Sequence, residues 1–313
     1  MSMAFVFPGQ GSQEVGMGKA LADAFPAARQ VFQEVDDALG QKLTRLMFEG
    51  PDEMLRLTEN AQPALMAVSM AVIRVLEEEG GFTLADRVSY VAGHSLGEYS
   101  ALAAAGAFGL SDAARLLKIR GQAMQKAVPV GRGSMAALLG LELEDVHAVA
   151  AAASQGEVCQ VANDNSPGQV VVSGDTTAVE RALALATEKG AKRCVILPVS
   201  APFHCTLMAP AAEVMAEALA KTRIDSPSPA LVANVIAESV ADPETIRRLL
   251  VEQVTGTVRW RECVLYIKEK GVTTLVEAGA GKVLSGLARR IDRDLVGKAI
   301  NGPADVEEFL KSL

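Results

Sequence analysis

The glycine-bounded pentapeptide Gly93-His94-Ser95-Leu96-Gly97 constrains the fold of this chain more than any other feature. It follows an apolar run at 88–92, typical of a buried strand, and opens an alanine-rich run at 96–105, typical of a helix. A serine on such a turn is held at an exposed corner, and the helix N-terminus behind it favours developing negative charge. The pattern predicts a nucleophile elbow with Ser95 as the nucleophile. An ordinary glycine turn capped by a serine is the alternative.

Three histidines are available to activate this hydroxyl: His94, His147 and His204. His94 is the neighbour of Ser95 in a tight turn, where adjacent side chains diverge, and His147 lies in a polar stretch expected on a surface helix. His204 follows the apolar run at 194–197, in the kind of strand-end loop where open α/β sheets gather their chemistry. We therefore predict that His204 is the general base for Ser95.

The predicted elements alternate between strand and helix, which indicates an α/β fold. A buried strand at 3–7 is followed by helices, and a long helix should begin after Pro63. Beyond the elbow and a helix at 111–126, the order becomes strand, helix, strand, strand, helix, strand, the ferredoxin-like split unit. Its strands are expected at 135–139, 158–162, 169–173 and 193–197, its helices at 142–153 and 176–189, and a turn at 163–168.

Proline and glycine at the borders of this unit indicate an insertion into a larger domain. We predict a large α/β-hydrolase-like catalytic domain formed by residues 1–130 and 199–313, with a small ferredoxin-like α+β subdomain at 131–198. Further strands of the large domain are expected near 230–235 and 273–277. The substrate should bind in a cleft between the two parts.

Composition excludes several classes of function. A net charge of −8 disfavours nucleic acid as a partner, and no apolar run approaches the roughly 18–20 residues of a membrane span. The N-terminus lacks the basic segment of a signal peptide, so we expect a cytoplasmic protein. Four cysteines without C-x-x-C spacing and only three histidines predict no metal site.

Two glycine-rich stretches do not fit nucleotide motifs, so we predict no cofactor. Gly9-Gln10-Gly11 lacks the third glycine of a dinucleotide fingerprint, and Gly279-Ala280-Gly281-Lys282 lacks the Ser or Thr of a phosphate loop. A glycine-rich turn after the first strand could instead supply a backbone N–H to an oxyanion.

Four motifs, in this order and at these intervals, resemble the malonyl-CoA:acyl carrier protein transacylases of fatty-acid synthesis. They are Pro8-Gly9-Gln10-Gly11-Ser12-Gln13, the elbow with Glu98-Tyr99, Arg120-Gly121-Gln122-Ala123-Met124 and Phe203-His204-Cys205. The resemblance spans nearly the whole chain and includes the inserted unit and Val258-Arg259-Trp260. One departure is Ala280, where the family often has proline, and we expect no consequence for the chemistry.

The resemblance implies a malonyl-CoA:acyl carrier protein S-malonyltransferase. Ser95 would take malonyl from coenzyme A and pass it to the phosphopantetheine thiol of holo acyl carrier protein, with His204 as base and acid in both half-reactions. The backbone amides of Gln10 and Leu96 would form the oxyanion hole, and the main-chain carbonyl of Gln253 would orient the histidine.

The resemblance also implies how the acyl group is selected. Arg120 would hold the free carboxylate of malonyl by a bidentate pair, which disfavours acetyl. Phe203 would limit the α-carbon, which disfavours methylmalonyl by about 1–3 kcal/mol. Gln62, with Asn163 and Asn165, would line the cleft, although both asparagines also suit a turn.

Two other classes of function stay open at this point. A serine esterase or thioesterase of the α/β-hydrolase type shares the elbow but needs an acid between Ser and His, and Asp164, Asp175 and Glu180 lie in that interval. A non-catalytic module that docks a carrier protein is the second. We further expect a monomer, and the sequence does not separate fatty-acid from polyketide synthesis.

Overall fold

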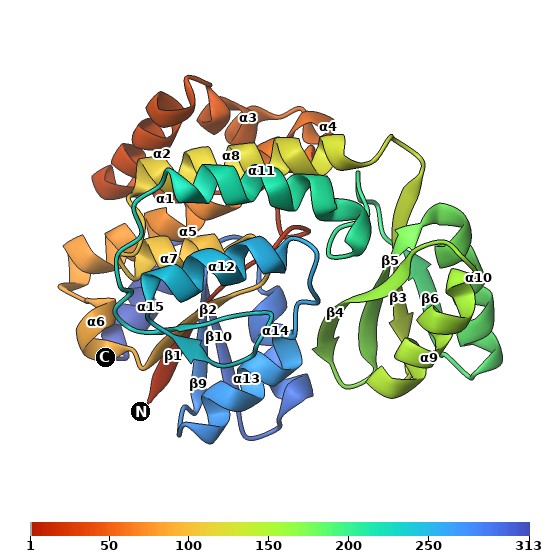
Figure 1. Cartoon of the computed structure of the whole chain (residues 1–313). Helices are drawn as coiled ribbons and strands as arrows, with labels where there is room; N and C mark the ends of the chain where they lie inside the picture. Colours follow the sequence, from red (N-terminus) through yellow and green to blue (C-terminus); the bar gives the residue numbers. More distant parts are fainter. Residues whose placement is uncertain (1) are drawn as a thin grey trace.

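Two β-sheets organise the computed structural model, which describes residues 2–313 (Figure 1). The larger sheet has six strands in the order β10-β9-β1-β2-β7-β8. The β7–β8 pair is antiparallel and the other neighbours are parallel. Its strands are β1 (Met3–Phe7), β2 (Tyr90–Gly93), β7 (Leu231–Val232), β8 (Ser239–Val240), β9 (Thr274–Ala278) and β10 (Val296–Ile300).

Helices cover both faces of this sheet, as a largely parallel sheet requires. They are α1 (Lys19–Ala24), α2 (Pro26–Leu39), α3 (Leu43–Glu49), α4 (Asp52–Leu55), α5 (Thr58–Gly80), α6 (Leu84–Arg87), α7 (Gly97–Ala104), α8 (Leu110–Ala127), α11 (Ala209–Ala220), α12 (Pro243–Gln253), α13 (Trp260–Glu269), α14 (Val283–Ile291) and α15 (Pro303–Lys311), with a 3₁₀ turn, η1 (Thr206–Met208).

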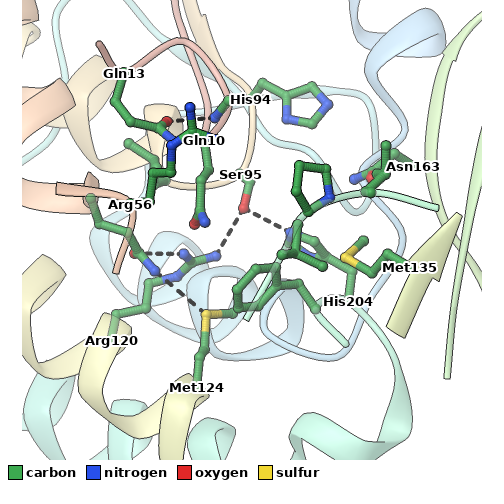
Figure 2. Close-up of a pocket in the computed structure, with 17 residues that line it drawn as sticks. Gln10, Gln13, Arg56, His94, Ser95, Arg120, Met124, Met135, Asn163 and His204 are labelled. Carbon is green, nitrogen blue, oxygen red and sulfur yellow. Dashed lines mark hydrogen bonds between the residues drawn. The ribbon is translucent and has the colours of Figure 1, made fainter. Parts of the chain in front are cut away.

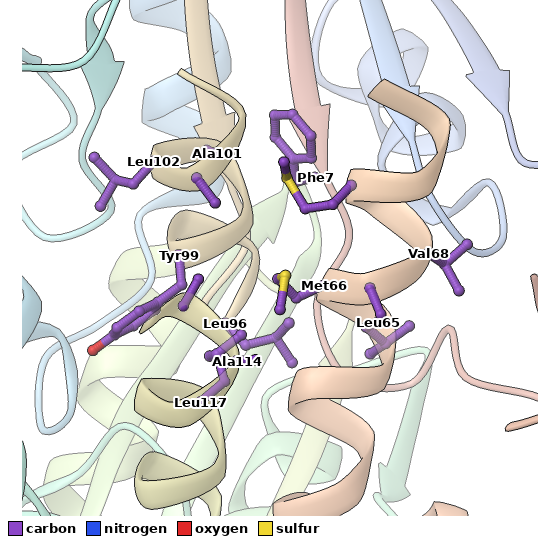
Figure 3. Close-up of a cluster of buried hydrophobic side chains, with 14 of the residues drawn as sticks. Phe7, Leu65, Met66, Val68, Leu96, Tyr99, Ala101, Leu102, Ala114 and Leu117 are labelled. Carbon is purple, nitrogen blue, oxygen red and sulfur yellow. The ribbon is translucent and has the colours of Figure 1, made fainter. Parts of the chain in front are cut away.

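Strand β1 shows how the sequence builds these layers. Successive side chains of a strand point to opposite faces. Phe5 and Phe7 join the core under α5, α7 and α8, part of which is drawn in Figure 3, whereas Ala4 and Val6 join the core under α13 and α14. All four side chains are fully buried, so an uninterrupted apolar run is what this central strand needs.

The inserted unit forms the second sheet, with the strand order β4-β5-β3-β6 and antiparallel pairing throughout. Its strands are β3 (Gly133–Leu139), β4 (Cys159–Ser166), β5 (Gln169–Asp175) and β6 (Arg193–Ile196), and its helices are α9 (Leu143–Ser154) and α10 (Thr176–Glu188). It has an apolar core of its own. The predicted α/β class with a small ferredoxin-like unit is confirmed, while the division at 131–198 stays a prediction.

Two predicted boundaries are wrong. The turn expected at 163–168 is mostly strand, because Asn163 and Asp164 pair with β5 across two irregularities in register. The long helix α5 begins at Thr58, before Pro63 rather than after it. Proline lacks one N–H, which would have bonded the carbonyl of Glu59 near the start of the helix, so a single bond is lost and the helix continues.

Strands β8 and β10 were not predicted. Strand β10 is an edge strand whose first three residues are exposed. Its sequence therefore lacks the continuous apolar run that marks the central strands. None of the helices within residues 2–313 is both long and apolar enough to cross a membrane.

A short backbone seam joins the small unit to the large one. The N–H of Val258 donates to Ala162 O at 2.8 Å, and its carbonyl accepts from Asp164 N at 3.0 Å. Arg261 Nε contacts the buried carboxylate of Asp164 at 2.9 Å. These contacts fix β4 beside the segment that precedes α13.

The close packing of the elbow on β1 leads to a stability prediction. A Cβ on Gly97 would lie 2.2 Å from Phe7 O, whereas a Cβ on Gly286, exposed in helix α14, would meet nothing within 4 Å. We expect Gly97→Ala to lower the free energy of unfolding by about 1–3 kcal/mol, as overpacking does. Gly286→Ala, the matched control, should raise it by about 0.5–1 kcal/mol. Equal urea midpoints for the two variants would contradict this packing argument.

Candidate active site

A cavity of about 290 Å³ lies beyond the carboxyl ends of β1 and β2, between the two sheets. Figure 2 draws the side chains that line it. This is the usual ligand position in open α/β sheets. The cavity brings together residues from the glycine-rich turn, the elbow, helices α5 and α8, and the loop before η1. Its lining includes Gln10, Gly11, Gln13, Arg56, Gln62, His94, Ser95, Leu96, Arg120, Met124, Met135, Asn163, Leu197, Pro198, Val199, Phe203 and His204.

The elbow places Ser95 at the floor of this cavity in a left-handed backbone conformation, with φ of 54°. A residue other than glycine is strained there and is held by its surroundings. The amide of His94 donates to Phe7 O at 3.0 Å, and the amide of Ser95 donates to Asn234 Oδ1 at 2.9 Å. The strained turn is therefore anchored on both sides.

His204 lies against the serine. Its Nε2 is 2.7 Å from Ser95 Oγ, and its Nδ1 is 2.9 Å from Gln253 O and 3.1 Å from Gly256 O. Since carbonyl oxygens only accept, Nδ1 carries the proton and Nε2 is free to accept the serine O–H. Nδ1–H thus donates to main-chain carbonyls, whereas in a Ser-His-Asp triad the corresponding N–H donates to a carboxylate. The pair can transfer a proton from the serine to the imidazole.

Burial keeps this imidazole neutral. The side chain of His204 is 3% exposed, and burial, together with the positive charge of Arg120, lowers its pKa to about 3. A base that stays unprotonated at neutral pH is ready to accept a proton from Ser95.

Within residues 2–313, the backbone amides of Gln10 and Leu96, both at the cavity, have no hydrogen-bond acceptor. Leu96 directly follows the nucleophile, and Gln10 follows the end of β1. Free N–H groups beside a nucleophile can hold an oxyanion.

Arg120 is a buried cation, 1% exposed, at the inner wall of the cavity. Its Nη1 donates to Gln62 Oε1 at 2.8 Å, and its Nη2 donates to Gln253 Oε1 at 2.9 Å and to Ser95 Oγ at 3.1 Å. All its acceptors are neutral. Because a buried cation is stabilised by an opposite charge, the site favours a ligand that brings a carboxylate.

The other predicted lining residues occupy different places. Gln62, Phe203 and Asn163 border the cavity. Asn165 lies outside its lining, and its Oδ1 accepts from His94 Nε2 at 2.8 Å, so these two side chains join the small unit to the elbow. Within residues 2–313, no group of three or more His, Cys, Asp or Glu side chains could hold a metal ion.

Two buried polar residues behind the elbow, Asn234 and Glu98, were not predicted as site residues. Asn234 follows β7 and is fully buried beside the elbow, and a lone asparagine gives no sequence signal. Glu98 is 1% exposed in α7, and burial raises its pKa to about 7. A charged residue within an alanine-rich helix directly behind the nucleophile was the signal for Glu98.

The family model and the similar proteins found by comparison agree with each other. Residues 4–298 match the family model described as an acyl transferase domain. The chain is 45% identical to a malonyl CoA-acyl carrier protein transacylase of Bacillus subtilis, over 99% of this chain and 97% of that protein. It is 46% identical to the malonyl CoA-acyl carrier protein transacylase of Escherichia coli K12, over 98% of this chain and 98% of that protein.

Solved structures agree with this result. An acyl-carrier-protein-S-malonyltransferase from Bartonella henselae superposes with a TM-score of 0.97 at 56% identity, covering 100% of this chain and 99% of that one. A malonyl-transacylase solved in complex with its type II PKS acyl-carrier protein superposes with a TM-score of 0.97 at 44% identity, covering all of both chains.

The environment of His204 predicts its titration. With a pKa near 3, well below 6.5, the imidazole should stay neutral as the pH falls from 7 to 5, with its proton on Nδ1. Imidazole ¹⁵N spectra recorded over this range should show this, with a His204→Gln variant to assign the signals. A protonation midpoint between pH 6 and 7, or a proton on Nε2, would contradict the proposed base.

Proposed function

The chain belongs to the malonyl CoA-acyl carrier protein transacylases, the S-malonyltransferases of fatty-acid synthesis, and we propose that it works through a covalent malonyl-Ser95 intermediate. In this ping-pong reaction malonyl-CoA is the acyl donor and the phosphopantetheine thiol of holo acyl carrier protein is the acceptor. The observation that carries the proposal is the position of Ser95 Oγ, 2.7 Å from His204 Nε2 and 3.1 Å from Arg120 Nη2.

In the first half-reaction Ser95 Oγ attacks the thioester carbonyl of malonyl-CoA while His204 Nε2 takes the hydroxyl proton. The amides of Gln10 and Leu96 stabilise the tetrahedral oxyanion, and losing one such donor typically costs about 10²–10³ in rate. The intermediate collapses to a malonyl ester on Ser95. The C–S bond breaks, and the coenzyme A thiol leaves with the proton that His204 returns.

The second half-reaction runs the same steps in reverse. The carrier thiol gives its proton to His204 and attacks the ester carbonyl, the bond to Ser95 Oγ breaks, and the proton returns to the serine. The carbonyls of Gln253 and Gly256 accept from Nδ1–H throughout, so that Nε2 is the nitrogen that takes and returns the proton; a carboxylate has this orienting role in a triad. The solved carrier complex of a 44% identical malonyl-transacylase supports a carrier protein as the acceptor.

Arg120 is the proposed acyl selector. Its guanidinium beside Ser95 Oγ would bind the malonyl carboxylate, and Gln62 would hold it from the other side. Acetyl would leave the buried cation without an opposite charge. Phe203, 7% exposed at the cavity wall, would leave little room for an α-methyl group.

Two alternative functions compete with this proposal. The first is a serine esterase or thioesterase, and the second is a non-catalytic module that docks a carrier protein. The main-chain partners of His204 favour the transferase over a hydrolase built on a Ser, acid, His triad. We extend the proposal to a monomeric, cytoplasmic enzyme that uses no cofactor. We also propose that residues 131–198 form one domain and that residues 1–130 and 199–313 form the other, with the cavity between them.

Acylation of Ser95 is the direct test. Intact-protein and peptide mass spectrometry after brief incubation with malonyl-CoA should show a malonyl adduct on the Ser95 peptide, which moves to holo acyl carrier protein when that is added. Ser95→Ala should give no adduct. An adduct that is lost to free malonate equally fast without carrier would indicate the hydrolase. No adduct, with carrier binding intact in Ser95→Ala, would indicate the docking module.

Arg120→Lys tests the acyl selector. Lysine keeps a charge but cannot form the paired contacts of the guanidinium. We expect the rate constant for malonyl loading to fall about 10- to 100-fold, as for a lost hydrogen bond to a charged group, with a smaller change for acetyl. Arg115→Lys, on the exposed face of the same helix, is the matched control and should load malonyl at the wild-type rate. If the rate constants for malonyl and acetyl loading fell by the same factor, the proposed role of Arg120 in selecting the acyl group would be wrong.

A further inference from the structure

A chain of buried polar side chains lies behind Ser95. It consists of Glu98, Asn234, Gln253 and Arg120, none of which is more than 1% exposed. Arg120 donates only to neutral oxygens, and Glu98 accepts from a backbone amide and a side-chain amide. A buried cation and a buried carboxylate are thus present without a direct ion pair.

The side-chain amide of Gln253 joins the two charges. Its Oε1 accepts from Arg120 Nη2 at 2.9 Å, while its Nε2 donates to Glu98 Oε2 at 3.0 Å and to Ser95 O at 3.0 Å. One planar amide therefore links the carboxylate of Glu98 to the guanidinium by two hydrogen bonds.

The two charges also fix the orientation of this amide. A guanidinium only donates and an ionised carboxylate only accepts. Reversing the Gln253 amide would place its NH₂ against Arg120 and its oxygen against Glu98, two repulsive contacts in a buried site. Glu98, together with the carbonyl of Ser95, thereby favours the orientation in which an oxygen faces Arg120.

Glu98 holds the elbow by a second route. The same Oε2 accepts from Asn234 N at 2.9 Å. The side chain of Asn234 accepts from Ser95 N at 2.9 Å and donates to Gly93 O at 2.7 Å. One carboxylate oxygen is therefore common to the support of the nucleophile and to the support of the arginine.

We propose that Glu98 is a positioning residue for acyl selection. Through Gln253 it holds the Arg120 guanidinium against the cavity, where a malonyl carboxylate can reach it, and through Asn234 it holds the turn that carries Ser95. Glu98 touches neither Ser95 Oγ nor the cavity, so it acts only through these two amides. The inference rests on the proposed role of Arg120 in binding malonyl.

The test compares how fast malonyl-CoA and acetyl-CoA acylate Ser95 at pH 8, in wild type and in three variants. Glu98→Ala removes the acceptor and frees the Gln253 amide, so the malonyl-to-acetyl ratio of loading rates should fall about 10- to 100-fold. Glu98→Gln keeps an oxygen in the same place and should restore the ratio to within about three-fold of wild type. Glu277→Ala removes another fully buried carboxylate, at the end of β9, and should leave the ratio unchanged.

The outcomes separate this inference from the proposed function. If wild type forms no malonyl-Ser95, the proposed function fails and the inference with it. If wild type loads malonyl, a Glu98→Ala variant that keeps the wild-type ratio, or slows malonyl and acetyl equally, overturns the positioning role alone. A Glu98→Gln variant as unselective as Glu98→Ala would also overturn it, since an acceptor oxygen would then not suffice. Thermal unfolding of each variant shows that the compared proteins are folded.

Discussion

The close approach of the elbow to strand β1 is the constraint on which the rest of the site depends. A Cβ on Gly93 would lie 1.9 Å from the backbone of Gly97, and one on Gly97 would lie 2.2 Å from Phe7 O. Because neither residue has a side chain, the turn can dock against β1, and Ser95 is held in a left-handed conformation. That conformation places the hydroxyl at the cavity and leaves the amide of Leu96 without an internal acceptor.

Burial then sets the charges of the site. His204 is neutral because a buried imidazolium beside Arg120 is unfavourable, so the base is ready without a carboxylate behind it. Arg120 stays a cation, but its partners are the neutral oxygens of Gln62, Gln253 and Ser95. The guanidinium therefore has no carboxylate as a direct partner beside the nucleophile. A dicarboxylic monothioester such as malonyl-CoA can supply such a partner with its free carboxylate.

Some residues of the site could be predicted from the sequence and others could not. Ser95 was evident from its glycines and flanking elements, and His204 from the small number of histidines and its position after a strand. The placement of Arg120 and Gln253 needed the resemblance to a family, since an arginine or glutamine in a helix has no pattern of its own. Asn234 was missed for the same reason. Residues 163–166 were wrongly expected in a turn, because asparagine, aspartate and serine favour turns locally while pairing with β5 holds them in a strand.

The sequence by itself determined the α/β class, the buried strand β1, the split unit and the nucleophile turn, because these depend on local periodicity and on glycines a few residues apart. Only the tertiary structure decided which groups meet at the cavity. Ser95 lies more than a hundred residues before both His204 and Gln253, and the contacts among the three involve side chains whose direction no local pattern encodes. The protonation state of His204 and the shared role of the Gln253 amide arise from burial and from fixed donor and acceptor geometry, and both exist only once the chain has folded.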